Sequence, residues 1–427
     1  MHISLPYAKS PLEADIDWGC FWGVLDVADV PAPPDVDAAA LSALTHPIGL
    51  DRDIFHTVLP GESVAIVVSD SFRKTGIHLI LPMLLEGLAK RGVRDENICF
   101  VFATGSHRAP TPREQEAILG EEAYARFRAR AFVHDCDDEA GLVALGRTSR
   151  GTPVLINRRV HEAARVIVTG SVVLHYFGGF GGGRKALVPG LAGRETIARN
   201  HILNLDPLEN RLNPDVRIGA LDGNPVSEDM LEAARMTRAD CLINTVLDRH
   251  GRIARIFAGD LDAAHRAACD FARSLFCIPI RQQADLVVAA AAETGNFVQA
   301  HKALFHACLA VRPGGRVVLA APCSEGLGGD QFVKWLRFGG PETVFDRLRE
   351  SAEINGQTAL SSLQKGPFTH LVTEMSGEDV ALLGAQKAAT LSEALEGARA
   401  ILGAAGVHRP AYYLMPTAAY AVPMLGD

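Results

Sequence analysis

The chain has 427 residues, of which 48% are hydrophobic, and this is more than a single hydrophobic core usually holds, so we expect two domains. The net charge of −8 is spread without long blocks of like charge, which disfavours nucleic acid and anionic membranes as partners. A low aromatic fraction of 6%, with abundant Ala and Gly, favours α/β packing over an all-β sandwich.

The cysteines and the N-terminus indicate a cellular compartment. The eight cysteines are scattered and form no C-x-x-C pair, which favours a reducing environment and argues against a disulfide scaffold or a zinc ribbon. The N-terminus is polar and acidic, with no apolar signal core, and no run of about 18 uncharged apolar residues follows it. We therefore expect a cytoplasmic protein that does not bind a membrane.

Strands and helices alternate along the chain after a Pro-rich start, which extends to about residue 60 and which we expect to hold strand remnants and a loop. Short β-branched runs and helical periodicity predict the elements of a first cycle, which are strands at 63–70, 97–107 and 164–173 with helices at 76–93 and 111–130. A second cycle has strands at 284–291 and 314–323 with helices at 298–311 and 390–402.

This alternation predicts parallel sheets, so the fold class is α/β with two domains, each holding a mainly parallel sheet flanked by helices. We expect residues 1–272 to form an N-terminal domain and residues 273–427 a C-terminal α/β domain.

Polar side chains follow the predicted strands, where open parallel sheets bind their ligands. Asp70 and Arg73 follow the first strand, His107 the second and His175 the third. Further polar groups follow the strands near 291 and 323, so a shared cleft is plausible. The alternative is that strand ends are loops, which are polar in any protein.

The third strand leads into "LHYFGGFGGGRKALVPG" at 174–190. A P-loop would need G-x-x-x-x-G-K-[ST], but Arg184 intrudes before Lys185 and no hydroxyl follows it. The dinucleotide pattern G-x-G-x-x-G fails as well, because Arg184 takes the place of the third glycine. Consecutive glycines at 181–183 can still bring backbone N–H groups close to an anion, whereas a merely flexible loop is the alternative. Lys185 could bind a phosphate or bond covalently to a cofactor.

The histidines allow acid–base chemistry or metal binding. His107 and His175 could exchange protons near neutral pH, although a lone histidine is more often structural. His201 has no H-x-x-x-H partner, so a metal bound there would take most of its ligands from another molecule. Arg73 and Lys302 are candidate anion holders, and Lys302 shares a helix face with Gln299.

The acidic segment "HDCDD" at 134–138 could be a metal cluster. Aspartates next to a strand end more often form turns through their own side chains, so the sequence favours an Asx-type turn there.

Several ordered segments resemble the nickel-dependent lactate racemases and related 2-hydroxyacid racemases and epimerases. The shared segments are "DSFR" (70–73), "GSHRAPT" (105–111), "HDCDD…LGRTSRGTPVLINRRV" (134–160), "GSVVLHYFGGFGGGRKALVPGLAGRETIARNH" (170–201), "NFVQAHKAL" (296–304) and "CSEGLG" (323–328). The longest is the most specific, because its arrangement of histidine, glycine loop, lysine and histidine is uncommon elsewhere.

The resemblance implies a cofactor, a nickel-pincer nucleotide covalently joined to Lys185, in which His201 completes the nickel coordination. It also implies that Asp70, Arg73 and the glycines Gly181, Gly182 and Gly183 lie at the cofactor. Enzymes that synthesise the cofactor would then be partners needed for activation. The N-terminal domain would bind the cofactor and perform catalysis, while the C-terminal domain would close over an interdomain active site.

The resemblance further implies that His107 and His175 are the acid–base pair and that Arg73, Gln299 and Lys302 bind the substrate. A hydride would leave and return to Cα through a 2-keto acid, with one histidine on each face of the substrate. Lactate-specific members carry an aromatic residue where this chain has Val298, so the substrate is lactate or a bulkier analogue. Two other classes stay open on the residues alone, a non-catalytic binder of nucleotides or phosphometabolites and a lysine-dependent pyridoxal phosphate enzyme.

Overall fold

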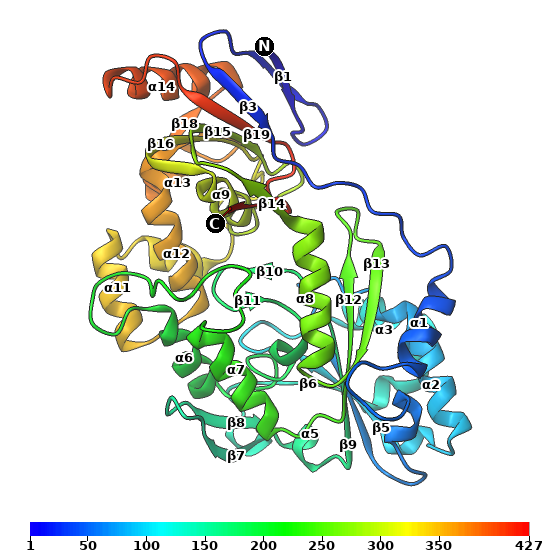
Figure 1. Ribbon diagram of the computed structural model, residues 1–427. Coiled ribbons are helices and arrows are strands. Elements are labelled where there is room, and N and C mark those ends of the chain that lie inside the picture. Colours follow the sequence, from blue (N-terminus) through cyan, green and yellow to red (C-terminus); the bar gives the residue numbers. More distant parts are fainter. Residues whose placement is uncertain (427) are drawn as a thin grey trace. The chain divides into compact units, whose positions relative to one another are not determined.

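The computed structural model describes residues 1–426, and the chain folds into two compact units (Figure 1). The central unit is Asp29–Ser274, and the terminal unit combines Met1–Ala28 with Leu275–Asp427. The change of unit at 274/275 lies close to the boundary expected at 272/273. The sequence analysis places the first 28 residues in the N-terminal domain, whereas in the structure they pack with the C-terminal part of the chain.

The central unit is built on a six-stranded sheet in the order β13-β12-β9-β4-β5-β6. Its strands are β4 (Val64–Ser69), β5 (Ile98–Ala103), β6 (Ala131–Val133), β9 (Arg165–Ser171), β12 (Cys241–Leu247) and β13 (Ile253–Gly259). All neighbouring strands run parallel except β12 and β13. The carboxyl ends of β5, β4 and β9 therefore lie next to one another, as the sequence predicted.

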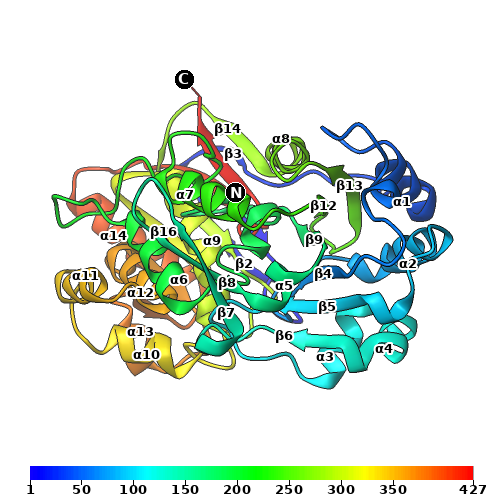
Figure 2. The same ribbon diagram turned by 90° about the horizontal axis from the view of Figure 1, so that it is seen from below.

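Alternate residues of these strands enter two separate cores. Val64 and Ile66 pack into a cluster with residues of α1 (Val36–Thr45), α2 (Leu81–Lys90) and α4 (Glu121–Phe127), and α1 contacts α2 on this face (Figure 2). Ala65 and Val67 point the other way, into a cluster that includes Leu187 and residues of α7 (Pro225–Met236) and α8 (Ala263–Phe276). The end of the glycine-rich segment thus forms part of one core.

The terminal unit holds a second six-stranded sheet, in the order β18-β17-β16-β15-β19-β3, with every neighbouring pair parallel. Its strands are β3 (Cys20–Val24), β15 (Ala284–Ala290), β16 (Val311–Ala320), β17 (Thr369–Val372), β18 (Gln386–Ala388) and β19 (Ala411–Met415). The pairing of β3 with β19 explains why the first 28 residues belong to this unit. The α/β class with two mainly parallel sheets is confirmed.

Helices cover both faces of the second sheet. The hairpin of β1 (His2–Leu5) and β2 (Leu12–Asp15) shares one cluster with α14 (Leu391–Ala404). Helix α9 (Phe297–Leu309) contacts β15 and β16, and α12 (Ile354–Lys365) packs against α9.

Two local expectations were wrong for identifiable reasons. The helix expected over 111–130 is broken into α3 (Pro112–Leu119) and α4, because Gly120 adopts a φ of 82°, which ends a helix. The Pro-rich start contains α1, whose first turn is capped by the side chain of Asp35 accepting from the Ala38 N–H. Within residues 1–426, no helix is long and apolar enough to cross a membrane.

Phe100 tests the first core of the central unit. Its ring is completely buried and lies 5.3 Å from the Phe127 ring. We expect Phe100→Ala to lower the free energy of unfolding by about 3–5 kcal/mol, because truncation of a buried aromatic loses its transfer energy and leaves a cavity. Leu208→Ala, at a side chain that is 91% exposed, should change it by less than about 0.5 kcal/mol. Urea titrations of both variants measure the difference, and equal midpoints would contradict the assignment.

Candidate functional site

The first strand ends of the central unit bring an aspartate and a histidine together. Asp70 follows β4 and is 3% exposed, and its Oδ2 lies 2.6 Å from Nδ1 of His107, which follows β5. A carboxylate accepts only, so the proton is on Nδ1 and the lone pair of His107 Nε2 is available to a ligand. The aspartate therefore fixes the ring and its tautomer.

His175 stands at the start of a small hairpin made by β10 (Leu174–His175) and β11 (Gly179–Phe180). Its Nδ1 accepts the backbone N–H groups of Phe177 at 3.4 Å and Gly178 at 3.2 Å. A nitrogen that accepts from an N–H carries no proton, so the neutral ring of His175 holds its proton on Nε2. His107 and His175 are thus set in opposite tautomers.

Lys185 lies on the short helical turn Gly183–Ala186, with its Nζ 5.3 Å from the centre of the Phe177 ring. The residue keeps some accessible surface, but protein surrounds it densely, and this desolvation lowers the pKa of its amine well below the usual value. The charges of Arg73 and Arg184 lower the pKa further. The lowered pKa increases the share of the neutral, nucleophilic form of this amine at a given pH.

His201 ends α6 (Arg194–His201) and is 1% exposed. Its Nδ1–H donates to the Ile197 carbonyl at 2.7 Å, and its ring lies 5.0 Å from the Phe177 ring. Burial, followed by the charge of Lys185, lowers the pKa of His201 to about 3, so the imidazole is neutral. A histidine whose Nδ1–H is held by a carbonyl presents Nε2 in the way that metal ligands do.

The Phe177 ring is therefore the centre of a cluster. The His175 ring lies 4.4 Å from it, and Lys185 and His201 contact it from other segments. We call His175, Phe177, Lys185 and His201 the Phe177 cluster. Arg73 belongs to its surroundings, because its charge acts on Lys185. The sequence did not single out Phe177, which is one residue in an aromatic–glycine run and has no chemistry of its own.

Three glycines of the loop are required by the protein itself. Gly179 has φ 72°, and a methyl group there would lie 1.9 Å from the Ala220 carbonyl oxygen. At Gly182, with φ 69°, it would lie 2.8 Å from a methyl of Val172. At Gly183, with φ 51°, it would lie 2.5 Å from the His265 ring. Close packing and left-handed backbone explain these glycines without a ligand, so cofactor binding by Gly181–Gly183 stays a prediction.

Three buried side chains hold this loop in place, and none of them is a predicted ligand-binding residue. Asn244 Oδ1 accepts the Gly183 N–H at 3.1 Å, and His265 Nε2–H donates to the Gly181 carbonyl at 2.9 Å. Arg184 is 3% exposed, and its Nη2 donates to Ser227 Oγ at 2.7 Å. The intruding arginine of the failed P-loop pattern is thus a structural anchor. Asn244, His265 and Ser227 lie on β12, α8 and α7, so only the tertiary structure reveals their contacts with the loop.

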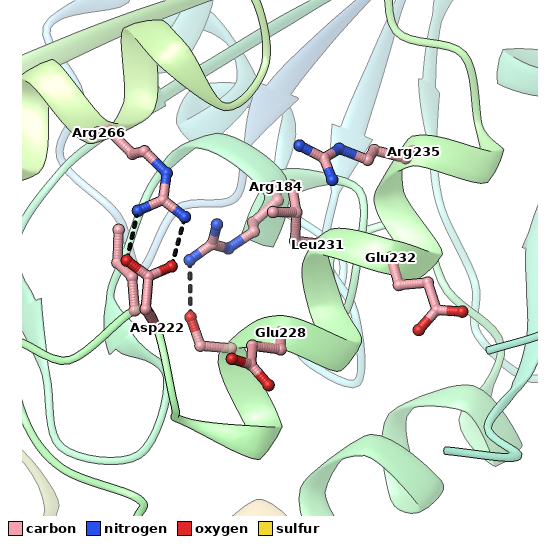
Figure 3. A pocket seen from close by; sticks show the side chains of 9 residues that line it. Arg184, Asp222, Glu228, Leu231, Glu232, Arg235 and Arg266 are labelled. Carbon is pink, nitrogen blue, oxygen red and sulfur yellow. Dashed lines mark hydrogen bonds and ion pairs between the residues drawn. The ribbon is translucent and has the colours of Figure 1, made fainter. Parts of the chain in front are cut away.

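A pocket of about 330 Å³ opens on the Arg184 side of the loop (Figure 3). Arg266 pairs there with Asp222 in a bidentate arrangement, at 2.8 and 2.6 Å. Glu228 and Glu232 on α7 are bound to Arg150 and Ser149. None of the predicted catalytic or substrate residues lines this pocket, and its charged side chains are bound within the protein, so we place no chemistry in it.

The remaining predicted residues lie in the terminal unit, at the start of α9. Asn296 caps this helix by accepting the Gln299 N–H at 3.2 Å, and Gln299 Oε1 accepts the Gly295 N–H at 3.1 Å. Lys302 is half-buried, with Nζ 5.9 Å from the Tyr420 ring centre. Their predicted role toward the substrate stays a prediction.

The "HDCDD" segment forms a turn, as the sequence favoured. Asp135 Oδ1 accepts the Asp137 N–H at 2.9 Å. Asp135, Cys136 and Asp137 have potential ligand atoms within 4.8 Å of one another, but both carboxylate oxygens of Asp137 accept from Arg194. This ion pair accounts for the carboxylate without a metal.

Known proteins resemble the chain over most of its length. Residues 7–211 match the lactate racemase N-terminal domain family. The lactate racemase of Lactiplantibacillus plantarum is 32% identical over 340 residues, which are 77% of each chain. The lactate racemase of Thermoanaerobacterium thermosaccharolyticum is 29% identical over 354 residues, covering 81% of this chain and 80% of the relative.

Two solved structures have a similar fold. The lactate racemase apoprotein from Thermoanaerobacterium thermosaccharolyticum superposes with a TM-score of 0.88 at 26% identity, covering 99% of this chain and 100% of that one. A Thermotoga maritima protein shares the fold with a TM-score of 0.61 at 18% identity, covering 86% of this chain and 94% of its own.

The lowered pKa of Lys185 makes a prediction about its reactivity. A lower pKa leaves more neutral amine at a given pH, so acylation of Lys185 in the apoprotein should reach its maximal rate at a lower pH than acylation of the exposed Lys334. Peptide mass spectrometry after brief treatment with acetic anhydride between pH 6 and 10 measures both rates. Acylation of Lys185 that begins only at the high end of this range would contradict the assignment.

Proposed function

The chain belongs to the lactate racemase family and is an isomerase, and we propose that it interconverts the D and L forms of a 2-hydroxy acid. The observation that carries the proposal is the pair of histidines set in opposite tautomers after β5 and β9, the two strands that flank β4, together with the desolvated amine of Lys185. Racemisation needs an acid and a base on opposite faces of one carbon, and this pair can supply both.

We further propose that the chain works with the family's nickel-pincer nucleotide, because the donors present fit that group. Lys185 offers a desolvated amine suited to a covalent bond, and His201 offers Nε2 with Nδ1–H held by Ile197. Both side chains contact the Phe177 ring, so the proposed point of covalent attachment and the proposed metal ligand lie against the same aromatic side chain. A single histidine suffices, since the pincer supplies the other nickel donors.

When bound, this group supplies a site that accepts and returns a hydride, so that the Cα–H bond of the substrate can break and form again. The chain's residues handle the protons. His107 Nε2, oriented by Asp70, accepts the hydroxyl proton of one enantiomer, which leaves a flat 2-keto acid. His175 Nε2–H donates a hydrogen bond to the same oxygen from the other side, and the proton held by His107 returns to that oxygen as the opposite enantiomer forms.

The reverse reaction uses the same two groups in the same roles. After one turnover His107 has returned its proton and both rings are back in their starting forms, so the same arrangement serves both directions. The Asp70 carboxylate stabilises the protonated form of His107. The substrate carboxylate needs a cation, and Arg73, which is exposed and whose charge acts on Lys185, is the group that we assign to it.

The covalent role of Lys185 is tested by mass. Wild-type protein co-produced with the enzymes that make the cofactor should exceed its sequence mass by one pincer nucleotide, located on the peptide that contains Lys185, and should contain nickel. Lys185→Ala should lack both, whereas Lys74→Ala, at an exposed lysine that follows Arg73 in the sequence, should keep both. An adduct retained in Lys185→Ala would refute the role, and a reducible imine in the wild type would indicate pyridoxal phosphate instead.

The proton-transfer roles are tested by rate. We expect His107→Gln and His175→Gln to lower the racemisation rate by about 10²–10⁴-fold, the usual share of a general acid–base group. Asp70→Asn should cause a smaller loss, roughly ten- to a hundredfold, because it removes the charge that stabilises protonated His107. His78→Gln, at an exposed histidine, is the control. Chiral chromatography of the products gives the rates, and wild-type rates in either catalytic variant would exclude that histidine.

A further inference from the structure

Phe72 is a large apolar side chain that the proposed chemistry does not use. It lies two residues after Asp70, and its backbone N–H donates to Asp70 Oδ1 at 3.1 Å. The same carboxylate holds His107 through its other oxygen. One aspartate therefore fixes both the base and the backbone that carries Phe72.

The aromatic ring of Phe72 lies against His107. The ring centres are 5.0 Å apart with an interplanar angle of 62°, an edge-on contact. Phe72 nevertheless remains 56% exposed, the second-highest exposure among the large hydrophobic side chains of residues 1–426. It belongs to none of the buried clusters, so the core of the fold does not explain an aromatic residue here.

The surroundings of Phe72 are less polar than the sequence suggests. The guanidinium carbon of Arg108 lies 5.3 Å from the centre of the Phe72 ring. Both terminal nitrogens of Arg108 donate to Glu114, at 2.7 and 2.6 Å, so its charge is compensated within the protein. The surface beside His107 is thus an open aromatic face flanked by an ion pair rather than by a free cation.

We propose that Phe72 contacts the side chain of the substrate and makes the enzyme prefer 2-hydroxy acids with an apolar side chain larger than methyl, aromatic or branched alkyl. This inference rests on the proposed function. The reacting carbon must lie near His107, and a substituent on that carbon that extends toward Phe72 meets an apolar surface. Burying part of the exposed ring under such a substituent is favourable, whereas a methyl group covers little of it.

The same arrangement disfavours an acidic side chain. A second carboxylate beside Phe72 would need a cation to offset its desolvation, and Arg108 is already committed to Glu114. Arg73 is assigned to the carboxylate that every 2-hydroxy acid carries. We therefore expect dicarboxylic 2-hydroxy acids to be poorer substrates than apolar ones of similar size.

A second role for Phe72 would give a different result. If the ring only supports His107, its removal impairs proton transfer to every substrate equally. If it recognises the side chain, its removal changes the ratio between substrates. The ratio of kcat/KM for two substrates is therefore the measurement that separates the roles.

The experiment uses enzyme carrying its cofactor, with nickel and adduct verified by mass. Racemisation of lactate, 2-hydroxy-4-methylpentanoate, phenyllactate and malate is measured for the wild type, Phe72→Ala, Phe72→Leu and the surface control Leu79→Ala, which is 46% exposed. We expect the wild type to favour phenyllactate over lactate, and Phe72→Ala to reduce this ratio by about tenfold, as the loss of one aromatic contact predicts. Phe72→Leu should keep most of the preference for the branched acid.

Three outcomes would overturn the inference. They are a wild-type preference for lactate or malate, a ratio that stays within about twofold in Phe72→Ala, or a loss in that variant that is equal for all four acids. Failure of the loaded wild type to racemise any of the acids would count against the proposed function itself. A Phe72→Ala protein that does not fold leaves the wild-type preference and Phe72→Leu to decide.

Discussion

The position of Lys185 is set by a tight backbone turn, and the surrounding protein leaves no space for side chains on three of the glycines in this turn. Gly179, Gly182 and Gly183 all adopt left-handed backbone, and a methyl group at any of them would overlap neighbouring atoms. Asn244 and His265 then hold the loop through its own backbone groups. Because the turn is fixed, consecutive side chains reach different partners: Arg184 is bound by Ser227, while Lys185 reaches Phe177.

The protonation states of the site follow from this packing. The Phe177 ring and the protein around it exclude water, and the loss of hydration disfavours the charged forms of Lys185 and His201. A neutral amine and a neutral imidazole are the forms that can bond to carbon and to a metal. His265 is treated in the same way, since burial and the charge of Arg184 lower its pKa to about 3. The neutral ring donates Nε2–H to the Gly181 carbonyl.

The two histidines that we propose for proton transfer are controlled differently, by hydrogen bonds that select a tautomer. Asp70 requires a proton on Nδ1 of His107, whereas two backbone N–H groups require its absence on Nδ1 of His175. These partners come from a strand end and from the hairpin that leads into the glycine loop. The same sheet that aligns β4, β5 and β9 therefore determines which histidine accepts and which donates.

The sequence by itself determined the α/β class and the strand ends that carry Asp70, His107 and His175, and it singled out Lys185 and His201 as candidates. Hydrophobic periodicity and residue chemistry are local properties, and the parallel order of strands follows from them. It could not determine that β3 completes the sheet of the terminal unit, because that pairing joins residues about 390 positions apart. Nor could it identify Phe177, Asn244 and His265 as the supports of the site, since their role consists entirely of contacts. The tertiary structure also decided why the loop is rich in glycine: the sequence suggested room for a ligand, and the fold shows backbone pressed against Ala220, Val172 and His265.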